Sequence, residues 1–109
     1  MRTDTEYAAL KLMHAAARLL SEGGRPVVLL PAFSFRAAGR DQKMDLLLVP
    51  WEHSGYATRL FFGNAISERG QNWTQHCVID RNWWAPSYNG VLATLPWREI
   101  LCAHIRSVA

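Results

Sequence analysis

Two cysteines and four histidines are the side chains of this sequence best suited to chemistry, and one of the cysteines stands in an unusual context. Cys77 lies in HCVIDRNWWAPS, residues 76–87, where a strand-like apolar run leads into an acid, two tryptophans and a proline. A cysteine in such a run can be a buried core residue, because cysteine is among the most buried residue types. It can also be a nucleophile at the start of a loop, which requires solvent access and some thiolate character. The sequence leaves both interpretations open.

The other cysteine and the histidines have the spacing of structural residues. Cys102 follows Leu101 in a predicted helix, near its apolar stripe, so we expect it in the core. The histidines at positions 14, 53, 76 and 104 make no HxxxH or CxxH pair, so we predict no metal site. A zinc site of His53, His76 and Cys77 is the remaining alternative. The motifs GxxxxGK[ST], GxGxxG and GxSxG are absent, so we expect neither a nucleotide nor another cofactor, and no displayed serine.

Length and composition predict one globular domain over residues 1–109. Hydrophobic residues make up 50% and charged residues 19%, which is an ordinary globular balance. The net charge of +3 comes with ten arginines and two lysines but no basic run or aromatic–basic stripe, so we expect no nucleic-acid partner. We also expect no membrane partner and a cytoplasmic protein with reduced thiols, because there is no signal core, no membrane-length apolar run and no disulfide framework.

Two helices are predicted near the two ends of the sequence. The first begins at Thr3, which forms a capping box with Glu6, and continues to the glycines at 23 and 24. The second begins after Thr94 as its cap, with Pro96 in its first turn. Its apolar residues recur at helical spacing, and they are Trp97, Ile100, Leu101, His104, Ile105 and Val108.

Strands are predicted between these helices. Residues 25–36, 43–52 and 56–62 are rich in residue types that suit a pleated sheet. Residues 65–72 are predicted as an irregular loop, 73–80 as a short strand or extended arm, and 82–90 as a further loop. Short connections favour an antiparallel meander. The expected fold is therefore a two-layer α+β domain with an N-terminal helix, a strand meander, an irregular crossing segment and a C-terminal helix.

This order of elements, with the segment around Cys77, resembles the ubiquitin-conjugating enzyme superfamily in its divergent bacterial form. That family places its active-site cysteine in a C-[LVI]-x-x context, followed by W-[SA]-P and a helix. Residues 77–80 (CVID), 83–86 (WWAP) and 95–108 are similar to these parts in turn. The family's His-Pro-Asn turn before the cysteine is absent here. The resemblance is specific over residues 77–86 and implies a compact version of that fold.

The resemblance implies thioester transfer on Cys77, with a ubiquitin-like modifier and its activating enzyme as partners. His76 and Arg81 would favour the thiolate electrostatically, although the side chains at 76 and 77 point to opposite faces of a regular strand. The nearest replacements for the family's asparagine are Asn72, before the cysteine, and Asn82, after it. Either would donate a hydrogen bond to the oxyanion. Asp80 would orient or deprotonate the incoming amine, or else cap the following turn.

Two sets of residues are candidate partner surfaces. Trp83 and Trp84 either pack the loop onto the last helix or form an exposed patch that docks a partner. Arg2, Lys11 and Arg18, on the first predicted helix, would meet an acidic partner, because the family's activating enzyme docks there.

The alternative to a transferase is a non-catalytic interaction domain of the same or another α+β fold. Exposure of the sulfur of Cys77 separates the two hypotheses. An exposed sulfur beside an asparagine donor favours the transferase, and a buried sulfur favours the interaction domain.

Overall fold

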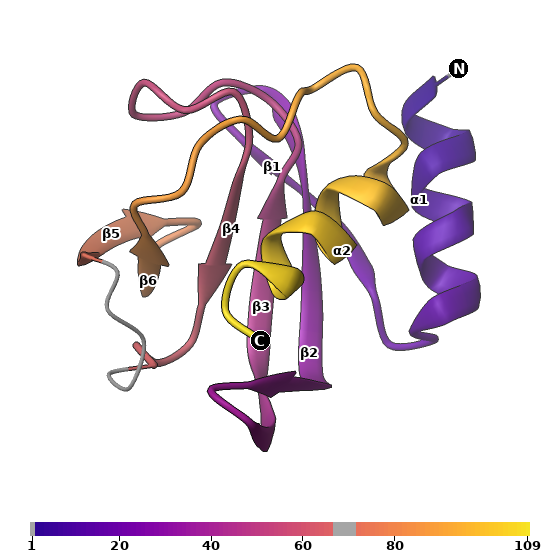
Figure 1. Ribbon diagram of the computed structural model, residues 1–109. Coiled ribbons are helices and arrows are strands. Elements are labelled where there is room, and N and C mark those ends of the chain that lie inside the picture. The colour runs from indigo at the N-terminus through magenta and orange to yellow at the C-terminus, as the bar shows by residue number, and fades with distance from the viewer. Residues whose placement is uncertain (1, 67–71) are drawn as a thin grey trace.

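The computed structural model describes residues 2–66 and 72–109, which form an α+β fold, as expected (Figure 1). Two helices, one near each end of the chain, accompany a single antiparallel sheet. The helices are α1 (Arg2–Met13) and α2 (Trp97–Arg106). The strands of the described residues are β1 (Arg18–Glu22), β2 (Arg25–Ala37), β3 (Arg40–Val49), β4 (Arg59–Phe62), β5 (Trp73–Val78) and β6 (Arg81–Pro86).

The sheet has the strand order β1-β2-β3-β4-β6-β5. Its first four strands follow one another in space as in sequence, so the predicted antiparallel meander is confirmed. The predicted loop at 82–90 is wrong in its first half, because residues 81–86 form β6 and pair with β5. Ile79 and Asp80 make the tight turn between these strands, with φ of 48° and 57°. Two positive φ values are the geometry of a hairpin turn, which matches the twist of the strands.

The N-terminal helix is shorter than predicted. It ends at Met13, and residues 18–22 form β1, which pairs with the start of β2 across Gly23 and Gly24. These glycines have φ of 58° and 79°, so they form a hairpin turn and not a helix stop. Pairing with β2 outweighs the helical spacing of the apolar residues, because it satisfies backbone groups and buries Ala17 beside the core.

Both predicted helix caps are wrong. Thr3 lies inside α1, and the carboxylate of Glu6 does not return to its own helix start. Glu6 Oε1 instead accepts the backbone N–H of Trp97 at 2.8 Å, in the first turn of α2. Thr94 lies three positions before the first residue of α2, and Pro96 holds the cap position without a side-chain hydrogen bond. A carboxylate from one helix thus satisfies an orphan N–H of the other.

The core occupies both faces of the sheet. On the face that α2 covers, a large cluster joins α1, the sheet and α2, with Leu10, Leu48, Phe62 and Leu101 at 0% exposure. The apolar stripe of α2 is confirmed, because Trp97, Ile100, Leu101, His104 and Val108 are all buried.

The opposite face carries a second cluster of buried residues, namely Val27, Leu47, Val49, Phe61, Val78, Trp83 and Ala85. No described helix covers this face. The curl of the sheet brings its ends together, because Glu22 at the end of β1 accepts the N–H of Ile79 in the β5–β6 turn at 3.1 Å. Asp45 on β3 also pairs with Arg81 on β6 at 2.7 Å. The curled sheet therefore encloses most of the second cluster, and Trp51, in the segment after β3, packs against it as well.

Candidate functional site

Cys77 is exposed on β5, which is the last strand of the sheet. Its cross-strand neighbour is Asn82 on β6, which is also exposed. Directly opposed residues of an antiparallel pair point to the same face, with Cβ atoms about 5 Å apart. The structure therefore brings a thiol and a carboxamide side by side in solvent.

Two buried neighbours turn Cys77 outward. Val78 and Trp83 belong to the second core cluster, at 1% and 0% exposure. The indole Nε1–H of Trp83 donates to the carbonyl of Val78 at 3.1 Å, which fastens the two strands beside the turn. Because strand side chains alternate between faces, burial of these two residues places Cys77 and Asn82 on the other face.

His76 does not join Cys77. It pairs with Trp83 and lies on the face of the second cluster, where its ring centre is 5.4 Å from that of Phe61 and 5.9 Å from that of His53. Partial burial lowers the pKa of His76, and the nearby Arg59 lowers it further. The electrostatic help predicted from His76 is therefore wrong. The alternative zinc site of His53, His76 and Cys77 is not assembled either.

The other two polar candidates have different outcomes. Asp80 is exposed in the hairpin turn, at φ 57°, three positions after Cys77. Asn72 stands before β5, at the opposite end of the hairpin, and its carbonyl accepts the N–H of Ser87 at 2.8 Å. Asn72 and Cys77 are five positions apart, which corresponds to about 16 Å along a strand. The prediction that Asn72 donates to the oxyanion at Cys77 is therefore wrong.

The two tryptophans also differ. Trp83 is fully buried, so the docking interpretation is wrong for it. It packs in the second cluster and not against α2, so the predicted packing onto the last helix is wrong as well. Trp84 is half-buried and pairs with Phe62 of β4. Trp84 alternates with Trp83, so it lies on the same face as Asn82 and Cys77. It remains a candidate partner contact beside the thiol.

The three basic residues do not share one helix face. Arg2 donates to the carbonyls of Ala93 and Leu95, at 3.0 and 2.6 Å, and so fastens α1 to the segment before α2. Arg18 begins β1, which corrects its placement on the first helix. Lys11 is exposed in the last turn of α1. Their predicted role in binding a partner stays a prediction.

Sequence reasoning missed a buried cation. Arg59 on β4 is 3% exposed, its guanidinium lies 4.1 Å from the ring centre of Tyr56, and it donates to the carbonyl of Pro86 at 3.1 Å. Burial lowers the pKa of Arg59. Burial also lowers the pKa of His53, and Arg59 adds to this effect. An arginine within an apolar strand was a detectable signal, but its burial depends on the segments that fold over it.

Within residues 2–66 and 72–109, no three His, Cys, Asp or Glu side chains converge as metal ligands. No helix of the described chain is long and apolar enough to span a membrane. Compared with protein-family models, curated proteins and solved structures, the chain matches none.

Proposed function

We propose that this protein carries a ubiquitin-like modifier as a thioester on Cys77 and passes it to an amine. The observation that carries the proposal is the exposed thiol of Cys77 opposite the carboxamide of Asn82. A thiolate that must meet a macromolecular thioester needs open access, and the end strand of the sheet provides it.

The reaction proceeds in two acyl transfers. The Cys77 thiolate attacks the carbonyl carbon of the thioester between modifier and activating enzyme, and the enzyme's sulfur leaves as a thiolate. An amine then attacks the new thioester, loses a proton and releases Cys77. Each step passes through a tetrahedral oxyanion, which the N–H groups of Asn82 can stabilise from across the strand pair. Asp80, in the adjacent turn, is the nearest carboxylate in sequence that can accept the proton of the amine.

The order of elements also supports this proposal. An N-terminal helix, a four-strand meander, a cysteine segment and a helix follow one another, in the order that the resemblance to ubiquitin-conjugating enzymes implies. The sequence has no His-Pro-Asn turn, so the proposal gives the role of that turn's asparagine to Asn82, which follows the cysteine in sequence.

A non-catalytic interaction domain is the second candidate, and one observation favours it. The imidazole of His76 lies on the opposite face, so no described histidine stands ready to activate the thiol. In that case Cys77, Asn82 and the half-buried Trp84 form a binding surface without chemistry.

Thiol reactivity and adduct formation test the proposal. Cys77 should alkylate with iodoacetamide faster than Cys102, which is half-buried on α2. With the cognate activating enzyme, modifier and ATP, the protein should form an adduct that reductant cleaves. Cys77→Ser should abolish this adduct or replace it with a slow oxyester that resists reductant, and Cys102→Ser should leave it intact.

Asn82 is tested by transfer kinetics. Asn82→Ala should slow transfer about 10²–10³-fold, the typical cost of one lost oxyanion donor, with alkylation of Cys77 unchanged. An adduct that still forms on Cys77→Ser, and that reductant cleaves as readily as the wild-type adduct, would refute the transferase. A Cys77 that alkylates readily but accepts no modifier would favour the interaction domain.

A further inference from the structure

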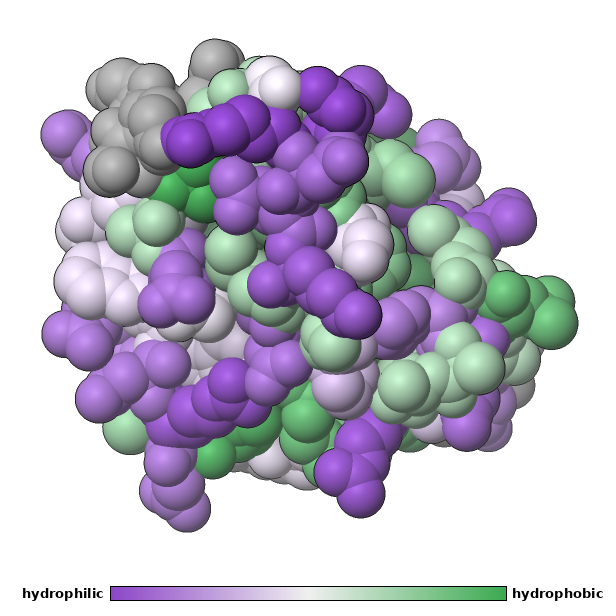
Figure 2. Space-filling view, turned by 90° about the horizontal axis from the view of Figure 1, so that it is seen from below, coloured by the Kyte–Doolittle hydropathy of each residue, from purple (hydrophilic) through white to green (hydrophobic). Residues whose placement is uncertain are grey.

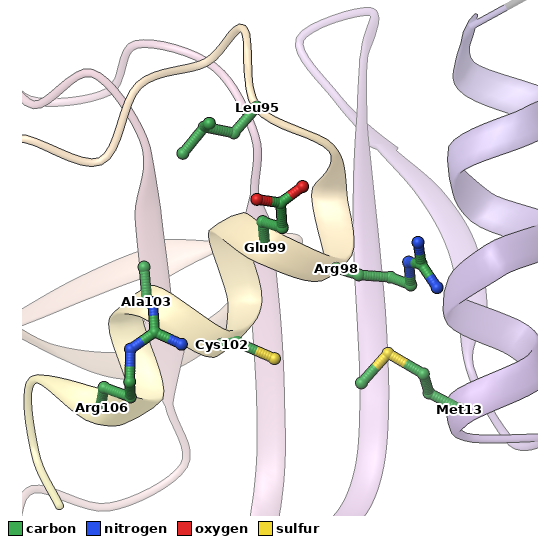
Figure 3. A pocket seen from close by; sticks show the side chains of 7 residues that line it. All are labelled: Met13, Leu95, Arg98, Glu99, Cys102, Ala103 and Arg106. Carbon is green, nitrogen blue, oxygen red and sulfur yellow. The ribbon is translucent and has the colours of Figure 1, made fainter.

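A groove between the end of α1 and the outer side of α2 is separate from the Cys77 site. Its volume is about 430 Å³. The residues that line it are Met13, Leu95, Arg98, Glu99, Cys102, Ala103 and Arg106 (Figure 3). In Figure 3 the sulfur atoms of Cys102 and Met13 point toward each other across the groove, and the guanidinium of Arg98 extends toward α1.

The apolar part of this groove continues onto α1. Met13 is 46% exposed and its neighbour Leu12 is 91% exposed, while Leu10 is the one buried residue of the helix. Seen from below, hydrophobic side chains gather on the side of the molecule where α1 lies (Figure 2). Large exposed hydrophobic residues beside a groove are typical of protein docking surfaces.

The charged residues that line the groove are two arginines, Arg98 and Arg106, and one carboxylate, Glu99, so its net charge is positive. Arg98, Cys102 and Arg106 are spaced by four residues, so they lie in one line along α2, and the two arginines stand about 12 Å apart along its axis. Neither arginine has an ion pair or side-chain hydrogen bond with another described residue. Arg98 also lies in the first turn of α2, where the helix dipole disfavours a cation. A binding role accounts for a cation at this position.

We infer that this groove binds an acidic segment of a partner protein, with an apolar side chain between two carboxylates. The apolar residue contacts Met13 and Cys102, and the carboxylates pair with Arg98 and Arg106. A spacing of about 12 Å corresponds to carboxylates eight residues apart on a helix or about four apart on an extended chain. A second copy of this protein fits poorly, because a two-fold contact here would set arginine against arginine.

Selection from a random peptide library tests this inference, and Cys102 supplies an internal reporter. The protein for selection is Cys77→Ser, which leaves Cys102 as the single thiol and removes the proposed transfer activity. Peptides of about twelve residues are displayed and panned against it. We expect acidic peptides with an apolar centre to be enriched and to slow alkylation of Cys102 by iodoacetamide.

Charge-reversal variants identify the surface. Arg98→Glu and Arg106→Glu should each weaken peptide binding about tenfold or more, and the neutral Arg98→Gln should lie between them and the parent. Lys43→Glu, the same charge change on an exposed residue of β3, should have no effect. Circular dichroism spectra equal to the parent's establish that each variant is folded.

Several results would overturn the inference. These are enrichment of neutral or basic peptides, failure to enrich any peptide, binding that Arg98→Glu leaves unchanged, and unaltered alkylation of Cys102. Dimerisation that Arg98→Glu abolishes, measured by sedimentation, would assign the groove to a second copy. Flotation with phosphatidylserine vesicles that Arg98→Glu abolishes would assign it to a membrane surface. None of these outcomes bears on transfer at Cys77, so the two proposals fail separately.

Discussion

Protonation of His104 should make this protein acid-sensitive well above the pH at which carboxylates titrate. His104 lies on α2 and is 4% exposed. Its Nε2 is 2.9 Å from the hydroxyl oxygen of Thr58, and that hydroxyl donates its single proton to the carbonyl of Val91 at 2.8 Å. The Thr58 oxygen therefore accepts from His104, which places the proton of the neutral imidazole on Nε2.

The magnitude follows from the pKa of His104. Burial lowers it from 6.5 to about 4, with a further contribution from the nearby Arg59. The unfolded chain therefore takes up the proton first as the pH falls, so the free energy of unfolding is highest above about pH 6.5 and decreases toward pH 4. The loss attributable to His104 is about 2 kcal/mol by pH 5 and about 3 kcal/mol once the folded protein is protonated as well.

Urea denaturation between pH 8 and 4.5, compared with His104→Gln, measures this contribution. The glutamine amide can still donate to Thr58 but does not titrate in this range, so the variant should lose about 2 kcal/mol less than wild type between pH 8 and 5. His53 and His76 have lowered pKa values as well, and they act in the same direction in both proteins. If both proteins lose stability equally over this range, His104 is protonated at little cost and the argument fails.

Four further substitutions test the packing and the helix ends. Leu101→Ala should lower the free energy of unfolding by about 2–5 kcal/mol, because Leu101 is fully buried in the core. Arg98→Ala should lower it by less than about 0.5 kcal/mol, as a surface change. Equal losses of melting temperature in the two variants would contradict the orientation of α2. Glu6→Ala should cost about 1 kcal/mol, because it removes the acceptor for Trp97 N–H. Thr3→Ala should leave the denaturation midpoint nearly unchanged, and a loss equal to that of Glu6→Ala would restore Thr3 as a cap.

The C-terminal helix and the meander could be predicted because their signals are local. The stripe from Trp97 to Val108 fits one helix face and the structure buries most of it. The fully apolar run Leu46–Val49 indicates a segment buried on both faces, and these four residues of β3 are all buried. In these elements local pattern and tertiary environment favour the same conformation.

The N-terminal region shows where local pattern fails. Residues 14–22 continue the helical spacing of apolar residues, and Gly23 and Gly24 fit both a helix end and a hairpin turn. Pairing between β1 and β2 favours the hairpin turn over the helix end. This pairing extends from Arg18 opposite Leu29 to Glu22 opposite Arg25. Glu6 is a similar case, because an S/T-x-x-E box specifies a local bond while its actual partner lies 91 residues away.

The geometry of the candidate site depends on the pairing register of β5 and β6, and the reactive residues themselves do not determine that register. His76 and Cys77 are adjacent, so one of them must face the second core cluster and the other must face away. A shift of one residue in the β5–β6 hairpin would exchange their positions. Burial of Val78 and Trp83, with the bond from the Trp83 indole to the Val78 carbonyl, fixes the register in which the thiol is exposed and the imidazole is not. The chemistry available at Cys77 thus depends on which of its apolar neighbours the curled sheet encloses.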